Sequence, residues 1–218
     1  KEGKDFKSRM GAHNPDTQMG WFIILGTMPI LIAGLLFKHA IEGSLRNLWI
    51  TVTVLVLFGV LLWVVDARSK QVKTMKEMTW KDALIFGIGQ MLALIPGVSR
   101  SGGTITFGRA MGYTREAAVR VSFLMAIPAV FGAGILEAVS AVKDVAAGNA
   151  GMFPGWGATI AATIVAFVVG YVVIIGFLKF VSTFSYKAFA IYRIALAVVV
   201  ALLLICGVLH PTEVVAAA

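Results

Sequence analysis

A single arginine lies in the middle of an apolar stretch of this sequence, surrounded by hydroxyl groups and glycines. The stretch reads Pro96-Gly97-Val98-Ser99-Arg100-Ser101-Gly102-Gly103-Thr104, and neither residues 83–95 nor residues 101–108 contain a charged side chain. A charged side chain at membrane depth costs about 2.5–3.5 kcal/mol at the centre of a helix, so it normally faces a cavity or a partner. Since a guanidinium beside several hydroxyls suits a phosphate group, we take this stretch as the candidate functional site.

The glycines and serines of this stretch predict an anion site at the start of a helix. We expect Ser99 or Ser101 to cap that helix, because serine is a favoured N-cap residue. The free N–H groups and the dipole at a helix N-terminus attract anions. Gly102 and Gly103 let an anion approach the backbone closely, since they have no side chain, and Gly97 is counted with them as a substrate-binding residue.

Arg100 is the residue that we expect to contribute most to this site. Its guanidinium is predicted to hold phosphate oxygens in a bidentate fork, a geometry that lysine cannot provide. Ser99, Ser101 and Thr104 are predicted to bind or orient the phosphate, although each hydroxyl alone is equally compatible with hydrogen bonding between membrane helices. Gln90, upstream of the loop, either faces the same cavity or only bridges helices.

The composition is that of an all-α integral membrane protein. Hydrophobic residues make up 59% of the chain, charged residues only 14%, and the mean hydropathy is +0.88. Windows of about 20 apolar residues predict transmembrane helices. Five such spans occur, at residues 18–37, 48–65, 117–142, 155–181 and 188–209. The net charge of +8 comes from short loops between spans and not from a basic groove, so no nucleic-acid partner is predicted.

The loop charges predict how the spans are oriented. Basic residues precede the first span, at residues 1–9, and follow the second, at residues 68–81, which places both segments in the cytoplasm. Because residues 109–120 are also basic, the segment 83–113 must enter and leave on the same side. We interpret it as a re-entrant helix–loop–helix that breaks at Pro96-Gly97. The alternative, a simple kinked span with residues 109–120 outside, contradicts the charge rule.

Other polar residues indicate little chemistry. The chain has one cysteine, Cys206, and three histidines without ligand spacing, so no metal-ligand set is predicted within it. Arg193 lies one turn into the last span. Its side chain either snorkels to the cytoplasmic surface or braces the site.

The stretch 96–104 resembles the second signature of the undecaprenyl-pyrophosphate phosphatases, also called bacitracin-resistance proteins. Shorter matches support this resemblance, which covers about Gly20 to Leu209. They are Gln90-Met-Leu-Ala-Leu-Ile-Pro96, Ser122-Phe-Leu-Met-Ala-Ile-Pro128 and Phe189-Ala-Ile-Tyr-Arg193.

The resemblance implies an inverted-repeat architecture in which each repeat has a re-entrant loop followed by three spans. Residues 83–209 are then one complete repeat with its loop at 83–113, and residues 18–66 are the last two spans of the other repeat, all within one polytopic domain, 1–218. The family's other loop carries glutamates and a Ser-Ser-Thr-Gly-His run that this sequence does not contain. We therefore expect the chain to begin partway through a longer protein whose missing part supplies the nucleophile and general acid.

The same resemblance implies a multi-pass enzyme of the bacterial plasma membrane that hydrolyses undecaprenyl pyrophosphate to undecaprenyl phosphate and inorganic phosphate. This reaction recycles the lipid carrier for cell-wall synthesis. The implied partners are the lipid substrate, the bilayer and, in a homodimer, a second copy of the chain. A divalent cation, Mg²⁺ or Ca²⁺, is the implied cofactor. The alternative interpretation is a transporter or translocase for a phosphorylated lipid carrier, since broken helices at the midplane also occur in transporters.

Overall fold

Five helices in the described part of the chain are long and apolar enough to cross a membrane, as the sequence predicts. The structure is a computed structural model that describes residues 14–148 and 155–212. Over these residues it is an all-α integral membrane protein. The basic residues at positions 1–9, on which the predicted orientation partly depends, lie outside the described residues.

The described helices follow one another with short connections. The α-helices are α2 (Pro15–Leu36), α3 (Lys38–Glu42), α4 (Leu48–Arg68), α5 (Trp80–Met91), α6 (Arg100–Ala110), α7 (Arg115–Ala146), α8 (Trp156–Thr183) and α9 (Lys187–Ile205). Single 3₁₀ turns occupy Ser44–Arg46, Met75–Glu77 and Leu92–Leu94. The five predicted spans correspond to α2, α4, α7, α8 and α9.

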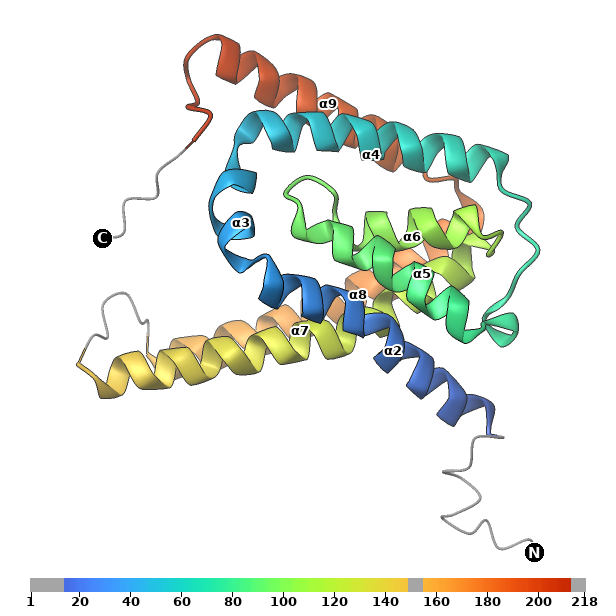
Figure 1. Ribbon diagram of the computed structural model, residues 1–218, viewed down its shortest axis with the longest axis horizontal. Coiled ribbons are helices and arrows are strands. Elements are labelled where there is room, and N and C mark those ends of the chain that lie inside the picture. Colours follow the sequence, from blue (N-terminus) through green and yellow to red (C-terminus); the bar gives the residue numbers. More distant parts are fainter. Residues whose placement is uncertain (1–13, 149–154, 213–218) are drawn as a thin grey trace, which may run out of the picture.

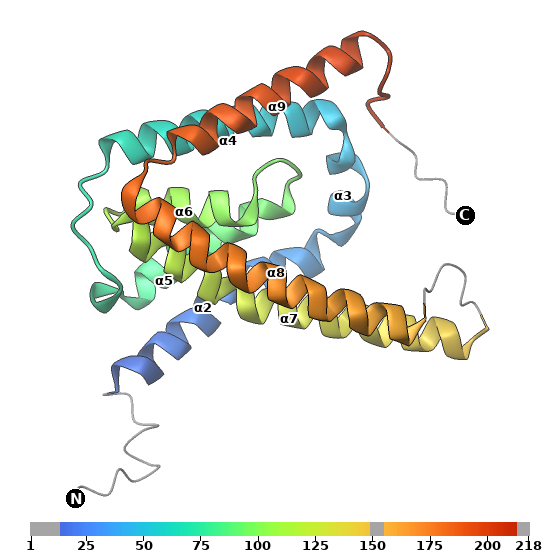
Figure 2. The same cartoon turned by 180° about the vertical axis from the view of Figure 1, so that it is seen from behind.

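The short helices α5 and α6 lie in the middle of the molecule, between pairs of long helices. α4 packs along α9 on one side of them, and α7 packs along α8 on the other (Figures 1 and 2). α2 crosses against α5 and α7. The α7–α8 pair extends beyond the rest of the molecule, and no side chain of α8 that the structure describes is buried. Long helices thus surround the pair of short helices that carries the candidate site.

Local sequence explains why α5 and α6 are two helices and not one span. Thr79 caps α5 through a capping box with Asp82. The chain leaves the helical conformation at Ile95, which is extended because the next residue is Pro96. With 12 and 11 residues, α5 and α6 are each only about 17–18 Å long at 1.5 Å per residue. Neither could cross a hydrocarbon core of about 30 Å.

Glycines allow the short helices to approach their neighbours closely. A Cβ on Gly89 would lie 2.9 Å from the Gly103 carbonyl oxygen of α6, so these two glycines form the contact between α5 and α6. A Cβ on Gly26 of α2 would lie 2.7 Å from the Ala83 carbonyl oxygen of α5. A methyl group at either place would force the helices apart, because real Cβ atoms do not approach so closely.

The two ends of the α5–α6 hairpin lie side by side. The N–H of Lys73, before α5, donates to the Gly112 carbonyl at 2.9 Å, and the N–H of Thr114, after α6, donates to the Lys73 carbonyl at 2.9 Å. Segments that share backbone hydrogen bonds cannot lie on opposite sides of a bilayer. This contact supports the predicted re-entrant path of residues 83–113, which stays a prediction, as does the division into two repeats.

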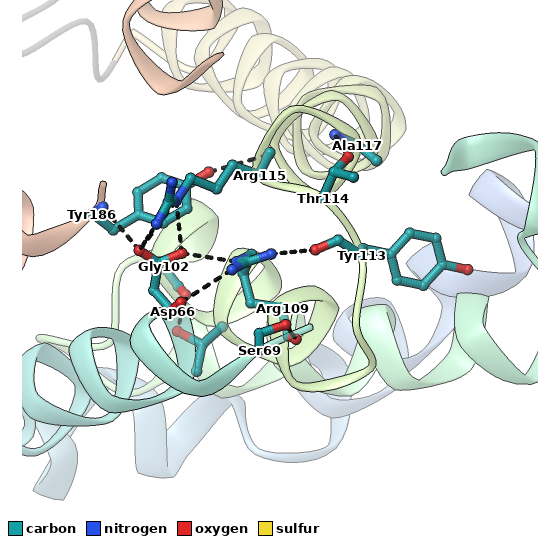
Figure 3. A network of polar contacts seen from close by, with 10 residues as sticks. Asp66, Ser69, Gly102, Arg109, Tyr113, Thr114, Arg115, Ala117 and Tyr186 are labelled. Atoms are coloured by element: carbon teal, nitrogen blue, oxygen red, sulfur yellow. Dashed lines mark hydrogen bonds and ion pairs between the residues drawn. The ribbon is translucent and has the colours of Figure 1, made fainter. Parts of the chain in front are cut away.

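A buried carboxylate joins four segments next to these ends. Asp66, in the last turn of α4, is 4% exposed and accepts hydrogen bonds from Arg109 Nε at 2.8 Å and Arg115 Nε at 3.0 Å (Figure 3). The backbone N–H of Tyr186, between α8 and α9, also donates to Asp66, at 3.2 Å. Arg109 is completely buried and bonds as well to the carbonyls of Asp66 and Tyr113. The sequence alone indicates only that Arg109 and Arg115 are loop charges, whereas the structure shows them to be partners of Asp66.

We predict that Asp66→Ala destabilises the protein by about 3–5 kcal/mol, because it leaves the buried Arg109 guanidinium without a counter-charge. The matched control is Glu116→Gln, which removes the exposed Glu116–Arg120 pair and is expected to cost less than about 1 kcal/mol. Thermal unfolding of both variants in detergent measures the difference. Equal melting temperatures for the two variants would contradict the role given to Asp66.

The re-entrant path predicts that both ends of the hairpin are labelled from the same membrane face. Single cysteines at the exposed positions Lys76 and Arg120, in a Cys206→Ser background, should react with an impermeant thiol reagent from one side. A cysteine at the exposed Lys143, near the far end of α7, should react only from the other side. Labelling of positions 76 and 120 from opposite faces would mean that residues 83–113 span the membrane once.

Candidate functional site

The predicted anion site lies at the start of α6, and Ser99 is the residue that caps this helix. The Ser99 hydroxyl oxygen accepts a hydrogen bond from the Gly102 N–H at 3.3 Å, and its carbonyl accepts one from the Gly103 N–H at 2.8 Å. The helix therefore leaves the N–H groups of Arg100 and Ser101 free for another acceptor. Ser99 has φ of +67°, a strained backbone conformation for a residue with a side chain, and such strain is concentrated at functional sites.

A small cavity lies beside this helix start. It has a volume of about 220 Å³, and its polar lining consists mainly of Ser99, Ser101, the backbone of Gly102, and Arg193 from α9. Its other lining residues are aromatic or aliphatic and come from α4, α6, α8 and α9, with Tyr186 between the last two. They are Leu55, Leu62, Ile105, Phe177, Tyr186, Phe189, Tyr192 and Leu196. The arrangement combines hydroxyls, a helix N-terminus and a guanidinium in an otherwise apolar cavity.

Arg193 reaches this cavity from a helix that is distant in the sequence. Its guanidinium donates from Nη1 to the Val98 carbonyl at 2.8 Å and from Nη2 to the Gly97 carbonyl. The residue is only 6% exposed, so it braces the loop and does not snorkel to the surface. Of the two alternatives that the sequence left open for Arg193, the structure supports bracing. An arginine one turn inside an apolar span was the signal that could have placed it among the site residues.

Arg100 points to the other side of the same helix start. Its half-buried side chain lines a groove of about 830 Å³ between α7 and α8, and the other lining residues are all apolar. The sequence predicts that Arg100 shares one anion site with the neighbouring serines. The structure instead places Arg100 in the groove and Ser99 and Ser101 in the cavity, because successive residues of a helix point in directions about 100° apart.

The two arginines at this end of α6 differ from those at its other end in their electrostatics. Among the described residues, no carboxylate lies within ion-pair distance of Arg100 or Arg193, whereas Arg109 and Arg115 both pair with Asp66. Uncompensated guanidinium groups and a helix N-terminus make this region strongly electropositive. Such a region attracts an anion and in particular a group with several anionic oxygens.

The remaining predicted residues have other surroundings. Thr104 is completely buried, and its hydroxyl donates to the Arg100 carbonyl at 2.8 Å. Gly103 faces Gly89 of α5, so its missing side chain serves the helix contact. Gly97 has φ of +100° and packs against the Thr51 carbonyl of α4. None of these three lines the cavity, and a role in binding is indirect for each of them.

Gln90 is buried in α5 without contacting the cavity. It is 0% exposed, and neither atom of its amide group has a hydrogen-bond partner among the described residues. The expectation that it bridges helices by a hydrogen bond therefore finds no support. It does not line the cavity of Ser99 and Arg193 either.

Tyr186 links the cavity to the Asp66 cluster. Burial raises the pKa of its hydroxyl, and the nearby Asp66 carboxylate raises this pKa further. The phenol therefore remains protonated at neutral pH, and it donates to the Arg115 carbonyl at 3.2 Å. The residue acts as a neutral hydrogen-bond donor here and not as a base.

The described residues do not form a ligand set for a divalent cation. No group of three or more histidine, cysteine, aspartate or glutamate side chains lies together in residues 14–148 and 155–212. The carboxylate within the hairpin helices, Asp82, bonds to Thr79 and Lys73 at the end of α5 that is far from the loop. The cation that the resemblance implies thus finds no fitting site in this part of the chain.

Comparison with known proteins gives a consistent result. The family model "Bacitracin resistance protein BacA" matches residues 2–199. The chain is 95% identical over all 218 residues to the undecaprenyl-diphosphatase of Bifidobacterium adolescentis, of which it covers 74%. It is similar to the undecaprenyl-diphosphatase of Bifidobacterium animalis subsp. lactis, with 76% identity over 98% of this chain and 72% of that protein. A third, from Bifidobacterium longum, is 66% identical over the whole chain and 74% of its own length.

These matches include the loop at 96–104, the hairpin and all five long helices. Because the family model matches residues 2–199, most of its length, the chain belongs to the bacitracin resistance protein BacA family.

Proposed function

We propose that this chain is an undecaprenyl-diphosphatase, a membrane hydrolase that removes the terminal phosphate from undecaprenyl pyrophosphate, and that the N-terminus of α6 binds the pyrophosphate. The family and its high-identity relatives support the reaction. The finer assignments, to the bacterial plasma membrane and to particular residues of the site, are part of the proposal.

The observation that carries the site assignment is the pair of arginines at the start of α6 that have no carboxylate partner among the described residues. An unpaired guanidinium in a partly buried site is costly unless an anion binds to it. The opposite end of the same helix shows that this fold does pair arginines where their role is structural, since Asp66 forms ion pairs with Arg109 and Arg115. The absence of such compensation beside Arg100 is what a binding site for a polyanion requires.

The chemistry of these residues suits phosphoryl transfer. Hydrolysis breaks the bond between the bridging oxygen and the terminal phosphorus and spreads negative charge over the phosphoryl oxygens in the transition state. The N–H groups of Arg100 and Ser101 are held by the helix before the reaction, so they stabilise this charge without reorganisation, and the Arg100 guanidinium adds a positive charge. The hydroxyls of Ser99 and Ser101 orient the phosphate. None of these groups is a general base, and the chain's residues at this site bind and orient the substrate.

The apolar surroundings fit a lipid substrate. The groove that Arg100 lines is otherwise apolar, so a pyrophosphate on an isoprenoid chain could contact the guanidinium and the apolar lining together. A free phosphate ester would leave that lining without a partner. The divalent cation remains a proposal from the family resemblance, because the described residues do not hold one.

Arg100→Ala is expected to lower phosphate release from undecaprenyl pyrophosphate at least about tenfold, because charge-assisted hydrogen bonds contribute roughly 1.5–3 kcal/mol. Arg100→Lys should restore little, since an ammonium cannot form the bidentate fork. The measurement is release of inorganic phosphate by the purified full-length protein in detergent, at matched amounts of folded protein.

Arg120→Lys is the matched control, because Arg120 is exposed and pairs with Glu116 outside the site. It should release phosphate at the rate of the unchanged protein. Near-normal release by Arg100→Ala would refute the role of Arg100. Movement of labelled lipid between leaflets without phosphate release would favour a translocase over the hydrolase.

A further inference from the structure

We propose that Arg193 is a positioning residue of the anion site: by holding the carbonyls of Gly97 and Val98 it keeps them away from the anion, so that the N–H groups at the start of α6 face it. The identity of the anion as a pyrophosphate rests on the proposed function above. The positioning of the loop by Arg193 does not.

The contacts of Arg193 are directed at two successive peptide groups. Nη1 donates to Val98 O at 2.8 Å and Nη2 donates to Gly97 O, so a single planar guanidinium fixes both peptide planes. Val98 is also completely buried, so the packing of its side chain helps to hold the same peptide group in place. Lysine could not replace this arrangement, because it is a point donor without the planar fork of arginine.

These carbonyls require a partner in this place. The loop carbonyls before α6 are not part of any helix, and carbonyl oxygens have a partial negative charge that would repel a phosphate. Gly97, with φ of +100°, allows the peptide to turn so that its oxygen faces α9. Arg193 therefore satisfies two loop acceptors, of which that of Val98 is buried, and at the same time removes two negative ends of dipoles from the site.

Gly102 provides the space that Arg193 occupies. A Cβ on Gly102 would lie 2.6 Å from Arg193 Nη1, which is closer than the two atoms can approach. The glycine at the third position of α6 is thus explained by the guanidinium beside it. This steric relation predicts that Gly102→Ala displaces Arg193 and disturbs the loop in the same manner as a change at Arg193.

The charge of Arg193 also remains available to the site. Both of its described hydrogen bonds go to neutral carbonyls, and no described carboxylate lies within ion-pair distance of it. The side chain lines the cavity together with Ser99, Ser101 and Gly102. Its position orients the loop, and its charge raises the local potential for an anion.

The test measures binding of inorganic pyrophosphate to the purified protein by isothermal titration calorimetry. Arg193→Lys and Arg193→Ala should raise the dissociation constant about tenfold or more, with a binding stoichiometry that stays unchanged per folded protein. A merely structural role would lower the stoichiometry or the melting temperature and leave the dissociation constant unchanged, and that result would overturn the proposal. Arg120→Lys is the control, and its dissociation constant should equal that of the unchanged protein.

Gly102→Ala gives an independent check through a double-mutant comparison. Alone it should weaken pyrophosphate binding, whereas in the Arg193→Ala background, where the clash is gone, it should cause a smaller additional loss. Losses that are equal in the two backgrounds would show that Gly102 and Arg193 do not act together.

A second measurement needs neither substrate nor activity. In a Cys206→Ser background, a cysteine at the buried position Val98 should react slowly with a thiol reagent while Arg193 is present. Adding Arg193→Ala should increase this rate about tenfold or more, because opening of the loop becomes less costly. An unchanged rate would refute the positioning role even if phosphate release supported the proposed function. Failure of the full-length protein to release phosphate would refute the proposed function and leave this loop test valid.

Discussion

The ion cluster around Asp66 is the interaction on which the rest of the structure depends. A single buried carboxylate binds the end of α6 through Arg109, the beginning of α7 through Arg115 and the connection between α8 and α9 through the Tyr186 N–H. Two short helices of 12 and 11 residues have few means of their own to remain in place among helices of up to 32 residues. A buried carboxylate is tolerated only with full hydrogen bonding, so a cluster that forms only in part would strongly destabilise the protein. The complete cluster therefore fixes the base of the hairpin.

From this base, close helix contacts determine where the other end of the hairpin lies. Gly89 against Gly103 sets the distance between α5 and α6, and Gly26 against Ala83 sets the distance between α2 and α5. In a membrane the hydrophobic effect does not drive helices together, so such close contacts and interhelical hydrogen bonds must do so. The loop at 95–99 is then held from the far side by Arg193, which bonds to Gly97 and Val98.

The charges of the hairpin have two different roles at its two ends. At the base, Arg109 and Arg115 share Asp66 as their ion-pair partner and contribute to the structure. At the loop, Arg100 and Arg193 have no described carboxylate partner and surround the free N–H groups of α6. One helix of 11 residues therefore lies between arginines that pair with Asp66 and arginines that have no described carboxylate partner. The proposed binding of a pyrophosphate at the loop follows from that separation more than from any single residue.

The sequence alone determined the fold class, the five spans and the position of the break at Pro96, because hydropathy and proline act over a few residues of chain. It also identified the start of α6. Of the two serines that the sequence offered as its N-cap, Ser99 and Ser101, Ser99 is the one that caps the helix. The tertiary structure decided which charges meet. Asp66 and Arg109 are 43 residues apart, and Arg193 and Val98 are 95 apart, so no local pattern could pair them. It also decided that Arg100 and the serines face different sides of α6 and that Gly103 serves packing, since side-chain direction and helix contacts depend on the neighbours that only the folded chain provides.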